Sequence, residues 1–280
     1  MGSATAVEPE CQCKDNATGA TYNFCYHLPV DPSVRGKRFD CRYLPQLKRL
    51  RLIGNLNNDY VWIEAGGIPE PTFITAASDN HFLEVQRLIV DFQRVLPNKS
   101  VVFYDIGLSE DNAAEMKSFC NVKYKKFHFS NYPVYVRKLK EYRWKILLIA
   151  VSSNIRFHES EPKCHALSLE HLKHLAEGRP PVWRNIKYLK DDHLDKVEEE
   201  AVLCALENKC LVPDGSKLFC KFNDGTYDKR VACHRYDQSL MSLLLTNRHA
   251  YNVKLWTSGV EDCFNITPGA ITRTSPKICH

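Results

Sequence analysis

The chain has 280 residues, which is near the upper limit of what a single hydrophobic core usually supports. Hydrophobic residues make up 44% of it and charged residues 25%, as in ordinary globular proteins. The net charge of +5 is too small for a nucleic-acid-binding protein, which normally concentrates many Lys and Arg side chains on one face. We therefore expect a globular protein with no nucleic-acid partner.

The first part of the chain shows no sustained periodicity. We expect residues 1–70 to form an irregular, cysteine-containing N-terminal arm. Residues 71–280 are expected to form a single α/β domain, whose part from 201 to 280 is rich in disulfides.

Strands and helices alternate between residues 72 and 129. Residues 72–77 and 101–105 are short apolar runs typical of buried strands, and residues 122–129 alternate like a third strand. Apolar residues recur at helical spacing from Phe82 to Leu96, including Leu88, and a second helix follows Ser109. This order predicts an open, mostly parallel, Rossmann-like sheet with crossover helices.

The pattern weakens beyond residue 129. Pro133 opens a helical stretch that leads to Ala150. Further elements are expected as helices at Leu167–Leu175, Leu194–Cys204 and Asp237–Leu244, and as a strand at Val253–Trp256.

Twelve cysteines, an even number, favour disulfides and an oxidising compartment. A zinc site is the alternative, since Cys11 with Cys13, or Cys233 with His234, could supply ligand pairs. The C-x2-C spacing of structural zinc sites is absent, and we assign no metal ligand. The connectivity stays open; the disulfide candidates of the C-terminal part are Cys204, Cys210, Cys220 and Cys233.

Three glycosylation motifs point the same way, at Asn16, Asn98 and Asn265. No signal peptide is visible, and the longest apolar run, Ile146–Val151, is too short to span a membrane. We expect a protein of the secretory pathway lumen, of the Golgi type, or a secreted one. A targeting segment or a membrane anchor would then lie outside this chain.

Ligands of open parallel sheets bind beyond the carboxyl ends of the strands, where loops lead into helix N-termini. Two loops, 75–81 and 105–109, fit that position and could receive a phosphate on free helix N–H groups. The candidate ligand-binding residues there are Thr75, Ser78, Asp79, Asn80, His81 and Asp105. The alternative is that Ser78, Asp79 and Ser109 only cap helices.

Residues 123–145 contain eight Lys or Arg and a single acid, Glu141. Interleaved with aromatic residues, they could bind a diphosphate or an anionic glycan, or they could form a solvated helix face. We single out Arg143, Trp144 and Lys145 as candidate binding residues because they lead into the apolar run that follows.

A second polar cluster spans His234 to Ser239. Asp237 is the candidate base for an acceptor hydroxyl, and Arg235 and Gln238 are candidate contacts to sugar hydroxyls. The alternative is that Asp237 is only the N-cap of a helix and that His234 is a surface side chain.

Several stretches together resemble one known family, domain of unknown function 1647, which is expanded in nematodes. The matching stretches are Phe73–Phe82, Tyr104–Ser109 and Tyr142–Lys145, with a looser match from Cys204 to Ser239. Members of this family look like lumenal glycosyltransferases. The resemblance therefore implies a sheet of the nucleotide-sugar transferase type, with a nucleotide-sugar and a glycan acceptor as partners.

The chain departs from this resemblance after Ala150. Relatives continue into a strand that carries an aspartate, whereas here the sequence runs almost directly into Ser152–Phe157. Such an aspartate, often in an Asp-x-Asp motif, holds a divalent cation on the sugar diphosphate, and no Asp-x-Asp occurs in this chain. No cofactor is assigned, apart from a divalent cation that would accompany a nucleotide-sugar.

Three functions remain open. The first is a glycosyltransferase-like protein that binds a nucleotide-sugar, with or without activity in this form. The second is a non-catalytic secreted binding or structural protein on the same scaffold. The third is a methyltransferase-like protein, suggested by residues 101–107, although only one glycine follows that strand.

Overall fold

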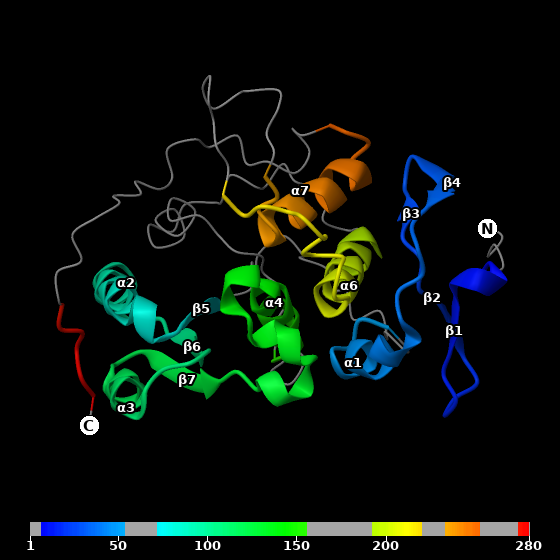
Figure 1. The fold of residues 1–280 in the computed structure, drawn as a ribbon. Helices are drawn as coiled ribbons and strands as arrows, with labels where there is room; N and C mark the ends of the chain where they lie inside the picture. Colours follow the sequence, from blue (N-terminus) through cyan, green and yellow to red (C-terminus); the bar gives the residue numbers. More distant parts are fainter. Residues whose placement is uncertain (1–6, 54–71, 156–191, 220–232, 253–273, 280) are drawn as a thin grey trace, which may run out of the picture. The chain divides into compact units, whose positions relative to one another are not determined.

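The computed structural model describes residues 7–53, 72–155, 192–219, 233–252 and 274–279 (Figure 1). These residues fall into two compact units. Unit 1 contains residues 7–53, 129–154, 192–219 and 233–252, and unit 2 contains residues 72–128, 155 and 274–279. The described N-terminal residues 7–53 thus belong to the same unit as segments that lie later in the chain.

Unit 2 contains a three-stranded parallel sheet made of β5 (Phe73–Ala77), β6 (Val101–Asp105) and β7 (Val122–Lys126), in that order. In its register Phe73 pairs with Val101, and Val101 pairs with Val122. The connections are the helices α2 (Phe82–Val95) and α3 (Glu110–Ser118). The mixed α/β class and the parallel pairing are confirmed.

Both helices of unit 2 pack on the same face of this sheet (Figure 1). Val101 and Phe103 of the central strand share one core with Val85 and Ile89 of α2 and with Met116 of α3. Two successive right-handed crossovers that advance in the same direction place both helices on one face.

The buried face of α2 differs from the expected one. Leu88 is exposed, and the helix buries the amides of Gln86 and Gln93 instead. Gln93 binds the C-terminal segment: its Nε2 donates to Cys120 O, and its Oε1 accepts from Lys277 N. A disulfide between Cys120 and Cys279 fastens the same segment covalently.

Unit 1 begins with two antiparallel hairpins that the sequence patterns did not indicate. They are formed by β1 (Gln12–Lys14) with β2 (Thr21–Asn23), and by β3 (His27–Leu28) with β4 (Asp31–Arg35). Disulfides join Cys11 to Cys25 and Cys13 to Cys41. The cross-links supply the stability that such short and largely exposed strands lack by themselves.

The helices of unit 1 are α1 (Leu44–Arg49), α4 (Arg143–Ile155), α6 (Asp192–Leu206) and α7 (Asp237–Arg248). The helical stretch expected from Pro133 is divided, because Tyr142 has a left-handed backbone with φ 56° and α4 begins only after it. Short 3-10 turns lie at Pro9–Cys11, Cys41–Tyr43, Asp79–His81, Phe129–Asn131, Val134–Arg137 and Leu139–Glu141.

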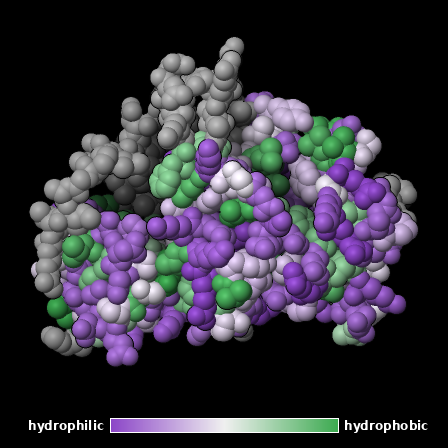
Figure 2. Space-filling view, in the orientation of Figure 1, coloured by the Kyte–Doolittle hydropathy of each residue, from purple (hydrophilic) through white to green (hydrophobic). Residues whose placement is uncertain are grey.

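Several expected features lie outside the described residues. These are the helix at Leu167–Leu175, the strand at Val253–Trp256, Cys220 and Asn265. Among the described helices, none combines the length and the apolar character that crossing a bilayer requires. Figure 2 shows hydrophobic residues in small separate areas among hydrophilic ones on the visible face of the described residues.

The first prediction concerns Glu200 on α6. Burial raises the pKa of this carboxyl to about 7. Because the folded-state pKa lies above the unfolded value, this group favours folding below about pH 4.5 and loses that contribution as the pH rises through 7. We expect Glu200→Gln to raise the free energy of unfolding at pH 8 by roughly 1–3 kcal/mol and to change it little at pH 4.5.

Chemical denaturation followed by circular dichroism at both pH values measures this difference. Glu110→Gln, which changes an exposed acid on α3, serves as the control and should behave alike at both pH values. Equal effects of Glu200→Gln at pH 4.5 and pH 8 would contradict the prediction.

Candidate functional site

The turns after β5 and β6 lie side by side in unit 2, because Ala77 pairs with Asp105 in the sheet. Backbone and side-chain bonds join the two turns. Asp79 N donates to Gly107 O over 3.1 Å, and Asp79 Oδ1 accepts from Ser109 N at 2.7 Å and from Asn112 Nδ2 at 2.8 Å. The bonds to Ser109 N and Asn112 Nδ2 lower the pKa of Asp79. The Asp79 carboxylate therefore links the two turns.

Asp105 is buried at the end of the central strand, with 3% of its surface exposed. Its Oδ1 accepts from Gly107 N and Leu108 N at 2.7 Å each, and its Oδ2 accepts from Tyr124 Oη at 2.6 Å. Burial and this bond raise the pKa of Tyr124 to about 12. Gly107 has a φ of +140°, which a side chain would disfavour, so the glycine permits the turn. Both carboxylate oxygens of Asp105 are therefore engaged inside the protein.

The other residues expected to contact a ligand here have varied surroundings. Thr75 lies within β5, opposite Phe103. The buried Ser78 donates from its Oγ to Asn80 Oδ1 over 2.6 Å, and the exposed His81 places Nδ1 3.1 Å from Glu84 Oε1. Ser109 accepts from Asn112 N and caps α3, as its capping interpretation requires.

Arg143 is completely buried in unit 1. Its Nη1 donates to the carbonyl oxygens of Ala205 (3.0 Å) and Glu207 (2.8 Å), and its Nη2 donates to that of Asn208 (2.6 Å). Its Nε donates to Glu141 Oε2 over 2.7 Å. The guanidinium therefore caps the C-terminal end of α6, where the helix dipole favours a cation. Those donors are not available to a diphosphate.

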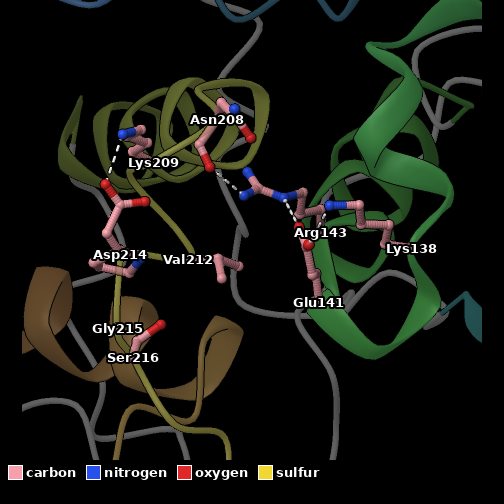
Figure 3. Close-up of a pocket in the computed structure, with 10 residues that line it drawn as sticks. Lys138, Glu141, Arg143, Asn208, Lys209, Val212, Asp214, Gly215 and Ser216 are labelled. Carbon is pink, nitrogen blue, oxygen red and sulfur yellow. Dashed lines mark hydrogen bonds and ion pairs between the residues drawn. The ribbon is translucent and has the colours of Figure 1, made fainter.

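A hollow of about 300 Å³ lies beside this cap (Figure 3). It is lined by Lys138, Glu141, Arg143, Asn208, Lys209, Val212, Pro213, Asp214, Gly215 and Ser216. Its two lysines are both paired: Lys138 Nζ lies 3.3 Å from Glu141 Oε1, and Lys209 Nζ lies 2.6 Å from Asp214 Oδ2. The charges that line it are thus largely balanced.

Lys145 and Asp237 come together although 92 positions separate them in the sequence. Lys145 Nζ lies 3.6 Å from Asp237 Oδ2, and the two side chains are 41% and 14% exposed. The same ammonium lies 4.5 Å from the ring centre of Tyr142 and 5.8 Å from that of Trp144. Trp144 is fixed by its indole N–H, which donates to Leu139 O over 3.1 Å. We call Tyr142, Trp144, Lys145 and Asp237 the aromatic–ion-pair site.

Asp237 is the first residue of α7, and the N-cap position before it is held by Tyr236, whose side chain makes no capping bond. The residue before it, Tyr236, has φ 43° and ψ −105°, a backbone conformation that is costly for a residue with a side chain. Arg235 and Gln238 are both exposed, and Arg235 N donates to Ser239 Oγ over 2.9 Å. Asp237 is therefore not the N-cap residue of α7, and its carboxylate lies beside Lys145.

Three of the four candidate cysteines of the C-terminal part form disulfides, as the disulfide interpretation predicts. Cys204 and Cys210 are joined to each other, and Cys233 is disulfide-bonded as well. In the part of the chain that the structure describes, no group of three or more His, Cys, Asp or Glu side chains could hold a metal ion. Asn16 and Asn98 are both exposed, as carriers of a glycan must be.

A comparison with models of protein families shows the family to which this chain belongs. A family model matches residues 11–150, which is half of the chain. The chain belongs to DUF1647. This family is described as proteins of unknown function, and the resemblance drawn from the sequence is confirmed at this level. Neither the curated proteins nor the solved structures contain a match. The DUF1647 match includes Tyr142, Trp144 and Lys145, whereas Asp237 lies beyond it.

Two features of this site had little signal in the sequence. The left-handed backbone of Tyr142 directs the chain into α4, and nothing in the residue type indicates it, since tyrosine rarely adopts positive φ. The pairing of Arg143 with Glu141 had a weak signal, because Glu141 is the single acid among many cations.

The cap on α6 generates the second prediction. Replacement of Arg143 by Met leaves three carbonyls and Glu141 without the cation that they now share. We expect Arg143→Met to lower the free energy of unfolding by roughly 3–5 kcal/mol. Urea denaturation followed by circular dichroism measures this change.

Arg137→Met removes an exposed cation from the preceding 3-10 turn and is the matched control. This control should stay within about 0.5 kcal/mol of the unchanged protein. If Arg143→Met is as stable as Arg137→Met, Arg143 does not hold the end of α6 in solution.

Proposed function

We propose that this DUF1647 protein is a glycosyltransferase-like protein of the secretory pathway lumen, of the Golgi type, or of the extracellular space. It binds a glycan acceptor at the aromatic–ion-pair site of unit 1. The parallel sheet of unit 2 is then part of a Rossmann-like fold. The disulfides support an oxidising compartment.

One observation carries the proposal: a partly exposed carboxylate and ammonium lie 3.6 Å apart beside two aromatic rings. Carboxylate oxygens accept hydrogen bonds from sugar hydroxyls, and an ammonium donates to a neighbouring hydroxyl oxygen. Aromatic ring faces offer an apolar surface to the C–H side of a sugar ring. Glycan hydroxyls therefore match both the polar and the apolar part of this site.

Asp237 also has the chemistry for the transfer step. The acceptor oxygen attacks the anomeric carbon of a nucleotide-sugar, and the bond from that carbon to the diphosphate oxygen breaks. The diphosphate leaves with the electron pair of that bond, and Asp237 accepts the hydroxyl proton as a general base. Lys145 then stays beside the reacting hydroxyl and offsets the charge of the carboxylate before the proton arrives.

A specific observation also favours the second function, a non-catalytic glycan-binding protein. The donors of Arg143 are occupied by Glu141 and by backbone carbonyls, so this expected diphosphate contact is already used. Binding at the aromatic–ion-pair site does not need Arg143. The two functions differ in whether Asp237 accepts a proton.

The third prediction separates them by Asp237→Asn, which keeps the shape and removes the base. We expect this variant to bind acceptor sugars with an affinity within about threefold, while sugar transfer falls roughly 100- to 10,000-fold. The probes are UDP- and GDP-sugars with a panel of methyl glycosides, with and without manganese. Release of nucleoside diphosphate measures transfer, and quenching of tryptophan fluorescence measures binding.

Unit 1 contains a matched control in the exposed pair of Lys209 and Asp214. Asp214→Asn should change neither readout. Binding without transfer in the unchanged protein assigns the non-catalytic function. If the unchanged protein and Trp144→Phe give the same response to every sugar, the aromatic–ion-pair site binds no glycan.

A further inference from the structure

A second hollow, of about 400 Å³, lies in unit 2 between the N-terminal parts of α2 and α3. It is lined by Asp79, Phe82, Leu83, Gln86, Asn112 and Glu115. The core of the same unit extends beneath it, since Phe82 and Val85 belong to the cluster that packs on the sheet. This amide-and-acid hollow uses none of the residues of the aromatic–ion-pair site, so an inference drawn from it is independent of the proposed function.

Gln86 lies in this hollow with 1% of its surface exposed. Its Nε2 crosses from α2 to α3 and donates to Glu115 Oε1 over 2.6 Å. Its Oε1 is buried and has no hydrogen-bond partner in the described structure. A buried acceptor without a partner costs about 1–3 kcal/mol, which a donor brought by a ligand would recover.

Two carboxylates, those of Asp79 and Glu115, add further acceptors to the hollow. Asp79 uses Oδ1 for Ser109 and Asn112, and Glu115 uses Oε1 for Gln86. The amide donor on α3, Asn112 Nδ2, already donates to Asp79 Oδ1. Among the described residues, the lining thus carries two carboxylates and no cation. An anion would be repelled here, and a ligand must bring its own hydrogen-bond donors.

The apolar part of the lining further limits the class of ligand that fits the hollow. Phe82 is buried, whereas Leu83 is 40% exposed and offers an apolar wall to solvent. A hydrated metal ion would gain nothing from this wall. A cation that carries an alkyl chain would bury the chain against Leu83.

We propose that the amide-and-acid hollow binds a primary alkylammonium group. Its three N–H donors match the carboxylates of Asp79 and Glu115 and the amide oxygen of Gln86. Its alkyl chain lies along Leu83. Both a lysine side chain and a free amine carry this group.

The fourth prediction uses two-dimensional amide NMR on the full chain. The probes are n-butylammonium and N-acetyl-lysine methylamide, with n-butanol as the neutral counterpart. We expect both ammonium probes to give saturable shifts of the Gln86 side-chain amide and of the backbone amides of 109–115. We expect n-butanol to give none at the same concentrations.

Two variants test the lining, each with a control on the same helix. Glu115→Gln keeps an oxygen for Gln86 and removes the charge, and it should weaken binding roughly tenfold. Asp111→Asn changes an exposed acid of α3 outside the hollow and should have no effect. Leu83→Ser should weaken binding about threefold, whereas Leu88→Ser, at an exposed position of α2 outside the hollow, should not.

The source of the group follows from the two ammonium probes. Tighter binding of N-acetyl-lysine methylamide assigns the hollow to a lysine side chain, and tighter binding of n-butylammonium assigns it to a free amine. Equal shifts with n-butanol would overturn the proposal. So would equal affinities of Glu115→Gln and Asp111→Asn, or tighter binding of N-acetyl-arginine methylamide than of either ammonium probe.

Discussion

The buried guanidinium of Arg143 is the constraint on which unit 1 depends. A cation without solvent is tolerated only where hydrogen bonds and opposite charge replace the water, and here the end of α6 and Glu141 do so. The same guanidinium lies 4.9 Å from the ring centre of Tyr135, whose hydroxyl donates to Leu206 O and contacts the hydroxyl of Tyr43. One buried charge therefore joins α4, α6 and the N-terminal segment, so this arrangement would be lost if any partner moved.

In unit 2, carboxylates rather than a guanidinium join neighbouring elements. Asp105 closes the turn after the central strand and binds Tyr124, and Asp79 joins that turn to α3. Strand-end carboxylates in parallel sheets are natural candidates for ligand contacts, but the inference has to be weighed against the bonds that each group already makes. In this unit, bonds to the turns, to β7 and to α3 account for both oxygens of Asp105 and for one oxygen of Asp79. Polar atoms that are not already used in such bonds are the better candidates for ligand contacts.

The sequence was informative where the determinants are local. The strands β5 and β6 and the helices α2 and α3 follow from apolar runs, caps and spacing within a few residues of each position. The two N-terminal hairpins could not be predicted in this way. Their strands are short and mostly exposed, and they depend on the disulfides of Cys11 and Cys13. The capping role of Arg143 was also hidden, since the carbonyls that it binds lie more than 60 residues further along the chain. The α/β class was thus predictable, whereas the use of each charged side chain was not.

The position of Asp237 at the start of α7 is informative about function. An acid at the start of a helix ordinarily stabilises that helix by capping it or by meeting its dipole. In α7 the N-cap residue is Tyr236, whose side chain makes no capping bond and whose backbone has an unfavourable positive φ, while the carboxylate of Asp237 lies 3.6 Å from Lys145 Nζ. A chain that needed only a stable helix would gain from a capping side chain and from relaxed backbone at this position. The unfavourable backbone of Tyr236, directly before an ion pair that lies beside the rings of Tyr142 and Trp144, is the physical reason to seek recognition or catalysis there.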